Sequence, residues 1–295
     1  MIEGLLFGMI STTCFGISNV YWKKAVVNND FSRIVFFRGL LTVTILGLLW
    51  LLMQTTGSTQ ILFIKQEAAS LTDVLLMIAL CAISSLGLVF YLLSLQYAPV
   101  SISVPLSSVN VFTILTAVLV LGEVFKPVYY FSFLLAGTGV WLINRRSSST
   151  STPWNRGALF AILASLFWGI TYALFKFPAM WLGALPLAFT LESCVMLTAF
   201  IWNRFAAPAN YSIFAPVTLA QTKHYFILSM LLMGGTLFYN LAVQLKDVLV
   251  LNIVGNLSLV ISVVLGVVWQ KENITALQIA GLVLILCSLI IVQLF

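Results

Sequence analysis

Long apolar runs fill this chain, and short polar stretches separate them. Most of the ten runs are close to the roughly 20 residues that an α-helix needs to cross a bilayer. Their continuity predicts helices, because the strands of a membrane barrel alternate between apolar and polar side chains. The predicted spans are Gly4–Trp22, Ile34–Met53, Val74–Leu95, Val100–Leu121, Val128–Ile143, Gly157–Phe175, Gly183–Ile201, Tyr225–Val243, Val248–Trp269 and Ile274–Leu294.

The second five runs resemble the first five. The segments that match at an offset of 153 residues are Gly4-Leu-Leu-Phe7 with Gly157-Ala-Leu-Phe160, Phe15-Gly16-Ile17 with Trp168-Gly169-Ile170, and Lys23 with Lys176. At an offset of 148 residues, Gly87-x-x-Phe90-Tyr91-x-Leu93-x-x-Gln96 matches Gly235-x-x-Phe238-Tyr239-x-Leu241-x-x-Gln244. Because five is odd, a duplicated set of five spans must enter the membrane in the opposite direction. Inverted repeats of this kind are typical of secondary transporters.

The predicted fold is therefore an all-α membrane protein, with ten transmembrane helices arranged as two inverted five-helix repeats. We place the first repeat at residues 1–146 and the second at residues 156–295. The stretch between them, residues 147–155, follows Arg145-Arg146 and is rich in serine and threonine, which is typical of a linker.

Composition points the same way. Of the 295 residues 61% are hydrophobic and 7% are charged, whereas soluble proteins carry about 25% charged residues. The net charge of +6 comes from basic residues near span ends, where lipid headgroups and topology account for them without nucleic acid. We expect a small-molecule substrate and the lipid bilayer as partners, and a monomer or a homodimer. The four cysteines lie in separate runs without a CxxC pattern, so neither a disulfide scaffold nor a metal site nor a cofactor is predicted.

One stretch resembles a known family. Leu95-Gln-Tyr-Ala-Pro-Val-Ser-Ile-Ser-Val-Pro105, running on to Leu121-Gly122-Glu123, is similar to the third turn, fourth span and closing Gly-Glu of the drug/metabolite transporter superfamily, EamA type. The arginine of Phe37-Arg38-Gly39 also fits this pattern, whereas Gln270-Lys271-Glu272 departs from it. The family includes bacterial exporters of amino acids and other metabolites. The resemblance implies a carrier of the bacterial inner membrane, with a cavity walled by spans one, three, four, six, eight and nine.

The orientation of the chain in the membrane stays open. The family resemblance implies that both termini lie in the cytoplasm. The loops after odd-numbered spans carry nine basic residues and those after even-numbered spans carry four. Because basic loops favour the cytoplasm, this count would place both termini outside.

Two ionisable residues fall within the predicted hydrocarbon region, Arg38 in span two and Glu192 in span seven. A charge at mid-span costs roughly 2.5–3.5 kcal/mol, so such a residue normally faces a partner or a wet cavity. One of the two could bind a carboxylate or take up a proton. The alternatives are a structural ion pair, or an arginine whose guanidinium reaches the headgroups.

Polar and aromatic residues of the other spans complete the predicted substrate-binding set. These residues are Asn19, Tyr91, Ser107, Asn110, Trp168, Tyr172, Tyr239, Asn240, Asn252 and Asn256. Buried amides and hydroxyls need hydrogen-bond partners, which a substrate could supply. The alternative role is helix–helix contact, since such side chains also bond across membrane helices.

Three further residues have predicted structural roles. Glu123 and Glu272 each stand near a lysine (Lys126 and Lys271) just before the next helix, where a carboxylate suits the helix N-terminus. Pro105 lies inside span four and predicts a kink there.

The sequence does not favour an enzyme. The single histidine, His224, stands at a predicted loop edge, the three aspartates lie near span ends, and no phosphate-binding loop is present. The function predicted is secondary transport of a small organic metabolite by alternating access, with export of amino acids or related amphipathic compounds. Two alternatives remain: an organic-anion or nucleotide-sugar exchanger, and a membrane scaffold or sensor that transports nothing.

Overall fold

The computed structural model describes residues 2–26, 31–55, 70–97, 100–107, 111–144, 156–206, 213–214, 217–270 and 275–294. Regular structure within these ranges is helical throughout. The helices are α1 (Ile2–Val26), α2 (Phe31–Thr55), α3 (Leu71–Tyr97), α4 (Val100–Ser107), α5 (Val111–Leu119), α6 (Pro127–Asn144), α7 (Arg156–Leu174), α8 (Lys176–Leu182), α9 (Ala184–Ala206), α10 (Leu219–Leu245), α11 (Val248–Gly255), α12 (Leu257–Gln270) and α13 (Ala276–Leu294).

The helices are long and apolar enough for a multi-pass integral membrane protein. Within the described residues, six helical segments are long and apolar enough to cross a membrane. These segments are Ile2–Trp22, Phe31–Thr55, Leu71–Tyr97, Arg156–Leu182, Ala184–Phe205 and Leu219–Leu245. The remaining predicted spans correspond to α4 with α5, to α6, to α11 with α12, and to α13. The prediction of helical spans is confirmed, whereas the count of ten crossings stays a prediction.

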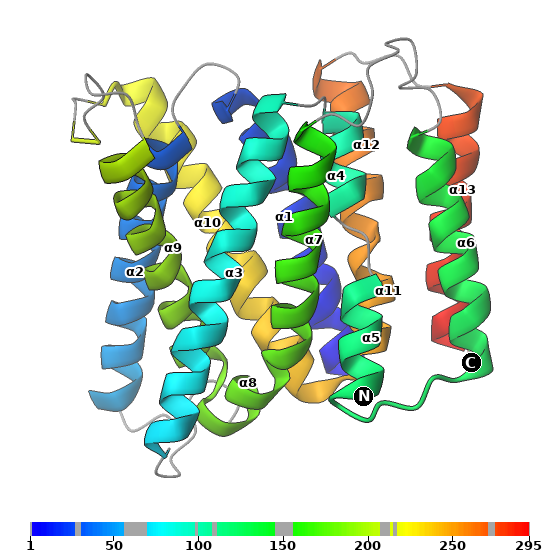
Figure 1. Ribbon diagram of the computed structural model, residues 1–295, viewed down its shortest axis with the longest axis horizontal. Coiled ribbons are helices and arrows are strands. Elements are labelled where there is room, and N and C mark those ends of the chain that lie inside the picture. Colours follow the sequence, from blue (N-terminus) through cyan, green and yellow to red (C-terminus); the bar gives the residue numbers. More distant parts are fainter. Residues whose placement is uncertain are drawn as a thin grey trace.

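Figure 1 shows that the long helices run roughly parallel to one another, and that the two chain ends lie at the same end of the molecule. The chain enters α1 at this end, but it enters α7, the first helix of the second half, at the opposite end. The two halves therefore run in opposite directions through the bundle.

The main helix contacts join the two halves to each other. Helix α1 packs on α10 and α3 packs on α7, while α2 packs on α9 and α6 on α13. In the two halves α1 is equivalent to α7, α3 to α10, α2 to α9 and α6 to α13. The pair α1–α10 is therefore equivalent to the pair α7–α3, and the other two pairs each join a helix to its own equivalent. This is the contact pattern of a pseudo-twofold axis, on which the equivalent helices α2 and α9 meet each other.

Two glycines show that the duplication extends to packing detail. A Cβ atom on Gly16 would lie 2.8 Å from the Cβ of Ile261, and a Cβ on Gly169 would lie 2.6 Å from the Cβ of Phe112. The glycines match at an offset of 153 residues and their neighbours at an offset of 149. Each half therefore uses the same close crossing between its first span and the other half's fourth span.

The ninth span, predicted as a continuous helix, is interrupted. Helix α11 gives way to α12 at Asn256, whereas in the fourth span the described part of α4 runs through Pro105 to Ser107. Glycine and asparagine are weak helix formers, and the Asn256 N–H bonds to the carbonyl of Ile253 at 3.1 Å in a tight turn.

Candidate binding cavity

A cavity of about 240 Å³ lies between the two halves. Its wall is built by the first four spans of each half, with Arg38 on α2 and Glu192 on α9. Ten of the twelve predicted site residues line it, namely Asn19, Arg38, Tyr91, Ser107, Trp168, Tyr172, Glu192, Tyr239, Asn252 and Asn256. Asn110 lies outside the described residues. Ten residues that were selected from the sequence therefore share one cavity. Their role in binding a substrate stays a prediction.

Asn240 is placed elsewhere. It is fully buried and does not belong to the cavity wall. Its Nδ2 donates a hydrogen bond to the backbone carbonyl of Ala184 at 3.4 Å. Asn240 therefore connects α10 to the first turn of α9, because its side chain leaves α10 on the side that packs against that helix.

Aromatic rings form one side of the cavity. The rings of Trp168 and Tyr172 are stacked, with centroids 6.2 Å apart and planes at 20°. Tyr91 extends this wall at one end, 5.3 Å from Trp168, and Tyr239 extends it at the other, 5.2 Å from Tyr172. Such a wall offers π faces to an apolar or cationic group.

The matched glycines of α3 and α10 hold two of the aromatic side chains in place. A Cβ on Gly87 would lie 2.7 Å from Cδ1 of Trp168, and a Cβ on Gly235 would lie 2.7 Å from Cε1 of Phe15. The indole Nε1–H of Trp168 also donates to the Ser84 carbonyl at 3.1 Å. Each glycine therefore makes room for an aromatic ring from the other half.

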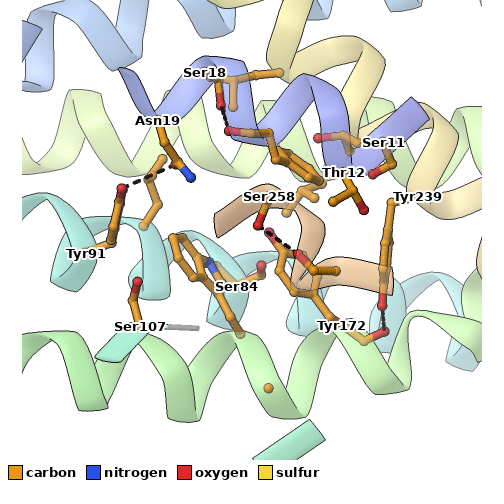
Figure 2. A pocket seen from close by; sticks show the side chains of 18 of the residues that line it. Ser11, Thr12, Ser18, Asn19, Ser84, Tyr91, Ser107, Tyr172, Tyr239 and Ser258 are labelled. Carbon is orange, nitrogen blue, oxygen red and sulfur yellow. Dashed lines mark hydrogen bonds between the residues drawn. The ribbon is translucent and has the colours of Figure 1, made fainter. Parts of the chain in front are cut away.

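The matched tyrosines make equivalent hydrogen bonds to different acceptors. The hydroxyl of Tyr91 donates to Oδ1 of Asn19 at 3.3 Å, and Nδ2 of Asn19 donates to Ser262 Oγ at 3.2 Å. The hydroxyl of Tyr239 donates to the backbone carbonyl of Tyr172 at 3.0 Å. Figure 2 shows both contacts, with Tyr91 reaching Asn19 of α1 and Tyr239 lying beside Tyr172.

One ion pair crosses the pseudo-twofold axis. Nη1 of Arg38 lies 2.6 Å from Oε2 of Glu192, and each side chain is 3% exposed. Thr236 donates to the other carboxylate oxygen at 3.3 Å, and the guanidinium lies 5.9 Å from the ring centre of Trp22. The alternative in which Arg38 reaches the headgroups is wrong, because its charge is buried and paired. The pair contributes no net charge to the cavity.

Sequence reasoning missed Phe15 and many of the hydroxyl groups of the wall. These hydroxyl residues are Ser11, Thr12, Ser18, Ser84, Thr113, Ser165, Thr236 and Ser258. On α1 the wall residues Ser11, Phe15 and Ser18 follow at spacings of four and three, which place side chains on one helix face. This spacing, together with the repeat match between Phe15 and Trp168, was the sequence signal that could have predicted these residues as part of the wall.

Glu123 caps a helix, but not the one that follows it in the sequence. Its Oε1 accepts a hydrogen bond from the Val248 N–H at 2.8 Å, and its Oε2 accepts one from the Leu249 N–H at 3.0 Å. The ammonium Nζ of Lys176 lies 2.8 Å from the same Oε1 and forms an ion pair with it. The expectation of a cap on α6 with Lys126 as the neighbouring cation is wrong, because the fold places the start of α11 beside the end of α5. Glu272 lies outside the described residues.

Comparisons with known proteins agree with this architecture. The sequence model of the EamA-like transporter family matches residues 2–145 and again residues 155–294. No curated protein matches the chain. A solved structure described only as a crystal structure of a protein is similar over 96% of both chains, with a TM-score of 0.68 and 16% sequence identity, and supports the fold alone. The chain belongs to the EamA-like transporter family, whose members are transporters and not enzymes, and it is a membrane transporter of the drug/metabolite type.

Proposed function

We propose that this protein is a secondary transporter that moves a small organic metabolite by alternating access, and that it exports amino acids or related amphipathic compounds across the bacterial inner membrane. The observation that carries this proposal is the cavity between two oppositely directed halves. Both halves contribute equivalent helices to its wall. A central site at the interface of inverted repeats is the arrangement from which alternating access follows, because the halves can exchange their conformations.

The chemistry of the wall favours a cargo without net charge. Hydroxyl and amide groups can bond the polar parts of such a molecule, and the rings from Tyr91 to Tyr239 can contact its apolar part. Arg38 and Glu192 provide one charge of each sign. A zwitterionic or neutral amphipathic compound therefore leaves no uncompensated charge in the cavity.

An exchanger of organic anions has less support. A phosphorylated cargo would need several uncompensated cations. Arg38 is the cation in the described part of the wall, and Glu192 already neutralises it. Lys176 is engaged by Glu123 and does not belong to the described wall.

A scaffold or sensor that transports nothing also has less support. Such a protein gains stability when side chains fill its interior, because empty space forfeits packing energy. The cavity of about 240 Å³ instead leaves room for a small ligand beside exposed polar groups.

The test is a thermal-stability screen of the purified protein against a metabolite library, followed by flux measurements. A ligand of the folded state raises the unfolding free energy by about 2.7 kcal/mol at a concentration of about 100 Kd. We expect stabilisation by zwitterionic or neutral amphipathic compounds, and saturable flux of the same compounds in proteoliposomes. Stabilisation by polyanions would favour the exchanger, and the absence of flux for every stabilising compound would contradict transport.

A further inference from the structure

The end of the molecule where both termini lie carries a contact between the halves that lies outside the cavity. Glu123 follows α5 of the first half, and its carboxylate binds the first two N–H groups of α11 in the second half. Lys176, the first residue of α8, adds an ammonium group from the second half. One carboxylate of the first half therefore has three donors, all of which belong to the other half.

The donors make this a strong site for a carboxylate. The first N–H groups of a helix have no partner within the helix and carry partial positive charge, so an anion there is favoured. The side chain of Glu123 is 7% exposed and that of Lys176 is 20% exposed, which limits screening by solvent. Asp247 contributes little, because its carboxylate is 61% exposed and lies 3.8 Å from the Lys176 ammonium.

The capped helix also forms part of the cavity wall. Leu251 and Asn252, which line the cavity, stand within one turn of the capped residues Val248 and Leu249. At a rise of about 1.5 Å per residue, the cap and the wall are separated by only a few ångströms along α11. A movement of the first turn of α11 therefore changes the wall at this end of the cavity.

We propose that the Glu123 carboxylate is a latch that closes the cavity at the end where the termini lie, and that this end opens when Glu123 leaves α11 and Lys176. The proposal rests on the alternating-access function proposed above. Lys176 and α11 both belong to the second half, so relative movement of the halves breaks all three contacts at once. A cap within one half would stay intact during such a movement.

The test measures how accessible the cavity wall is from the latched end. A single cysteine replaces Leu251 in a background where Cys14, Cys81, Cys194 and Cys287 are alanine. A membrane-impermeant maleimide is then added to sealed vesicles on the side of the termini. We expect Glu123→Gln to raise the labelling rate roughly tenfold, since Gln lacks the charge and the second acceptor oxygen. Glu3→Gln, an exposed carboxylate on the first turn of α1, is the matched control and should leave the rate unchanged.

A charge exchange separates the two parts of the latch. The double variant Glu123→Lys with Lys176→Glu restores an ion pair but places an ammonium group at the N-terminus of α11. We expect labelling to stay fast in this variant. Slow labelling would overturn the role of the helix terminus, because the ion pair alone would then suffice. Lys176→Met keeps the hydrogen bonds from the Val248 and Leu249 N–H groups to Glu123, and it should raise the labelling rate by roughly threefold. This variant tests the latch if the Glu123 variants do not fold.

The labelling needs no known cargo, so the latch and the transport function can fail separately. Unchanged labelling of folded Glu123→Gln, with flux still present, would overturn the latch and leave the carrier. Fast labelling of the variant, together with no flux of any compound by the unaltered protein, would support the latch and contradict the carrier. Gel filtration and the unfolding temperature in detergent establish which variants are folded.

Discussion

The two halves of this transporter are alike in how they pack and different in what they present to the cavity. Gly87 of the first half receives the ring of Trp168, and Gly235 of the second half receives the ring of Phe15. The glycines are equivalent and the rings stand at equivalent positions. The scaffold keeps its symmetry, while one half has an indole with a hydrogen-bond donor at the position where the other half has a phenyl group without one.

Tyr91 and Tyr239 show the same combination of equivalent positions and different chemical groups. Each donates to the residue at the same position of its own half, but the acceptor is the Asn19 side chain for Tyr91 and the Tyr172 backbone for Tyr239. Alternating access needs two halves that can adopt each other's conformation. Recognition of an asymmetric molecule needs different groups on its two sides. Duplication followed by divergence at the cavity satisfies both requirements.

The contrast is sharpest on the pseudo-twofold axis, where one half supplies a cation and the other an anion. Replacing Arg38 with methionine leaves the Glu192 carboxylate buried without its partner, which should cost about 3–5 kcal/mol of unfolding free energy. Replacing both residues with methionine should cost far less, because no charge stays buried. A double-mutant cycle of unfolding in mixed micelles measures the difference. Equal losses in the single and double variants would show that packing, and not charge, matters here.

The symmetry of the scaffold can be tested at the glycines. Gly87→Ala and Gly235→Ala should each lower the unfolding free energy by about 1–3 kcal/mol, since the added methyl overlaps a packed ring. Gly137→Ala in α6 is the matched control, because no atom lies within 4 Å of its Cβ position, and it should be neutral or slightly stabilising. Clearly unequal losses of unfolding free energy at Gly87 and Gly235 would contradict the equivalence of the halves.

The smallest effect should separate the two tyrosines. Tyr91→Phe frees the amide of Asn19 to turn toward a ligand, whereas Tyr239→Phe leaves a backbone carbonyl that the α7 helix holds in place. One neutral hydrogen bond contributes about 0.5–1.5 kcal/mol. We expect Tyr91→Phe to change ligand affinity by roughly threefold to tenfold and Tyr239→Phe to change it less, as measured by titration calorimetry with a stabilising compound.

The sequence predicted the features that arise from local patterns and from the repeat. Apolar runs predicted the helical spans, and matched motifs such as those at Gly87 and Gly235 predicted the duplication. The repeat also identified polar positions on equivalent spans of the two halves. Asn19 and Asn256 were selected in this way, and both line the one cavity.

The sequence could not predict contacts that depend on how distant segments meet. Glu123 was expected to cap the helix after it, because sequence proximity says nothing of the α11 terminus that the fold brings beside it. Asn240 was assigned to the cavity because a polar residue in an apolar helix can face either a cavity or a neighbouring helix. The direction of its side chain decides between them, and that direction follows from packing against Ala184.

The central claim is that the cavity between the halves holds the transported molecule. Counterflow of one radiolabelled compound from the stability screen, measured in proteoliposomes with the unaltered protein and with Trp168→Ala, tests it most directly. The account predicts saturable flux that is largely lost in the Trp168 variant at retained folding. Flux that persists unchanged in folded Trp168→Ala would contradict the claim.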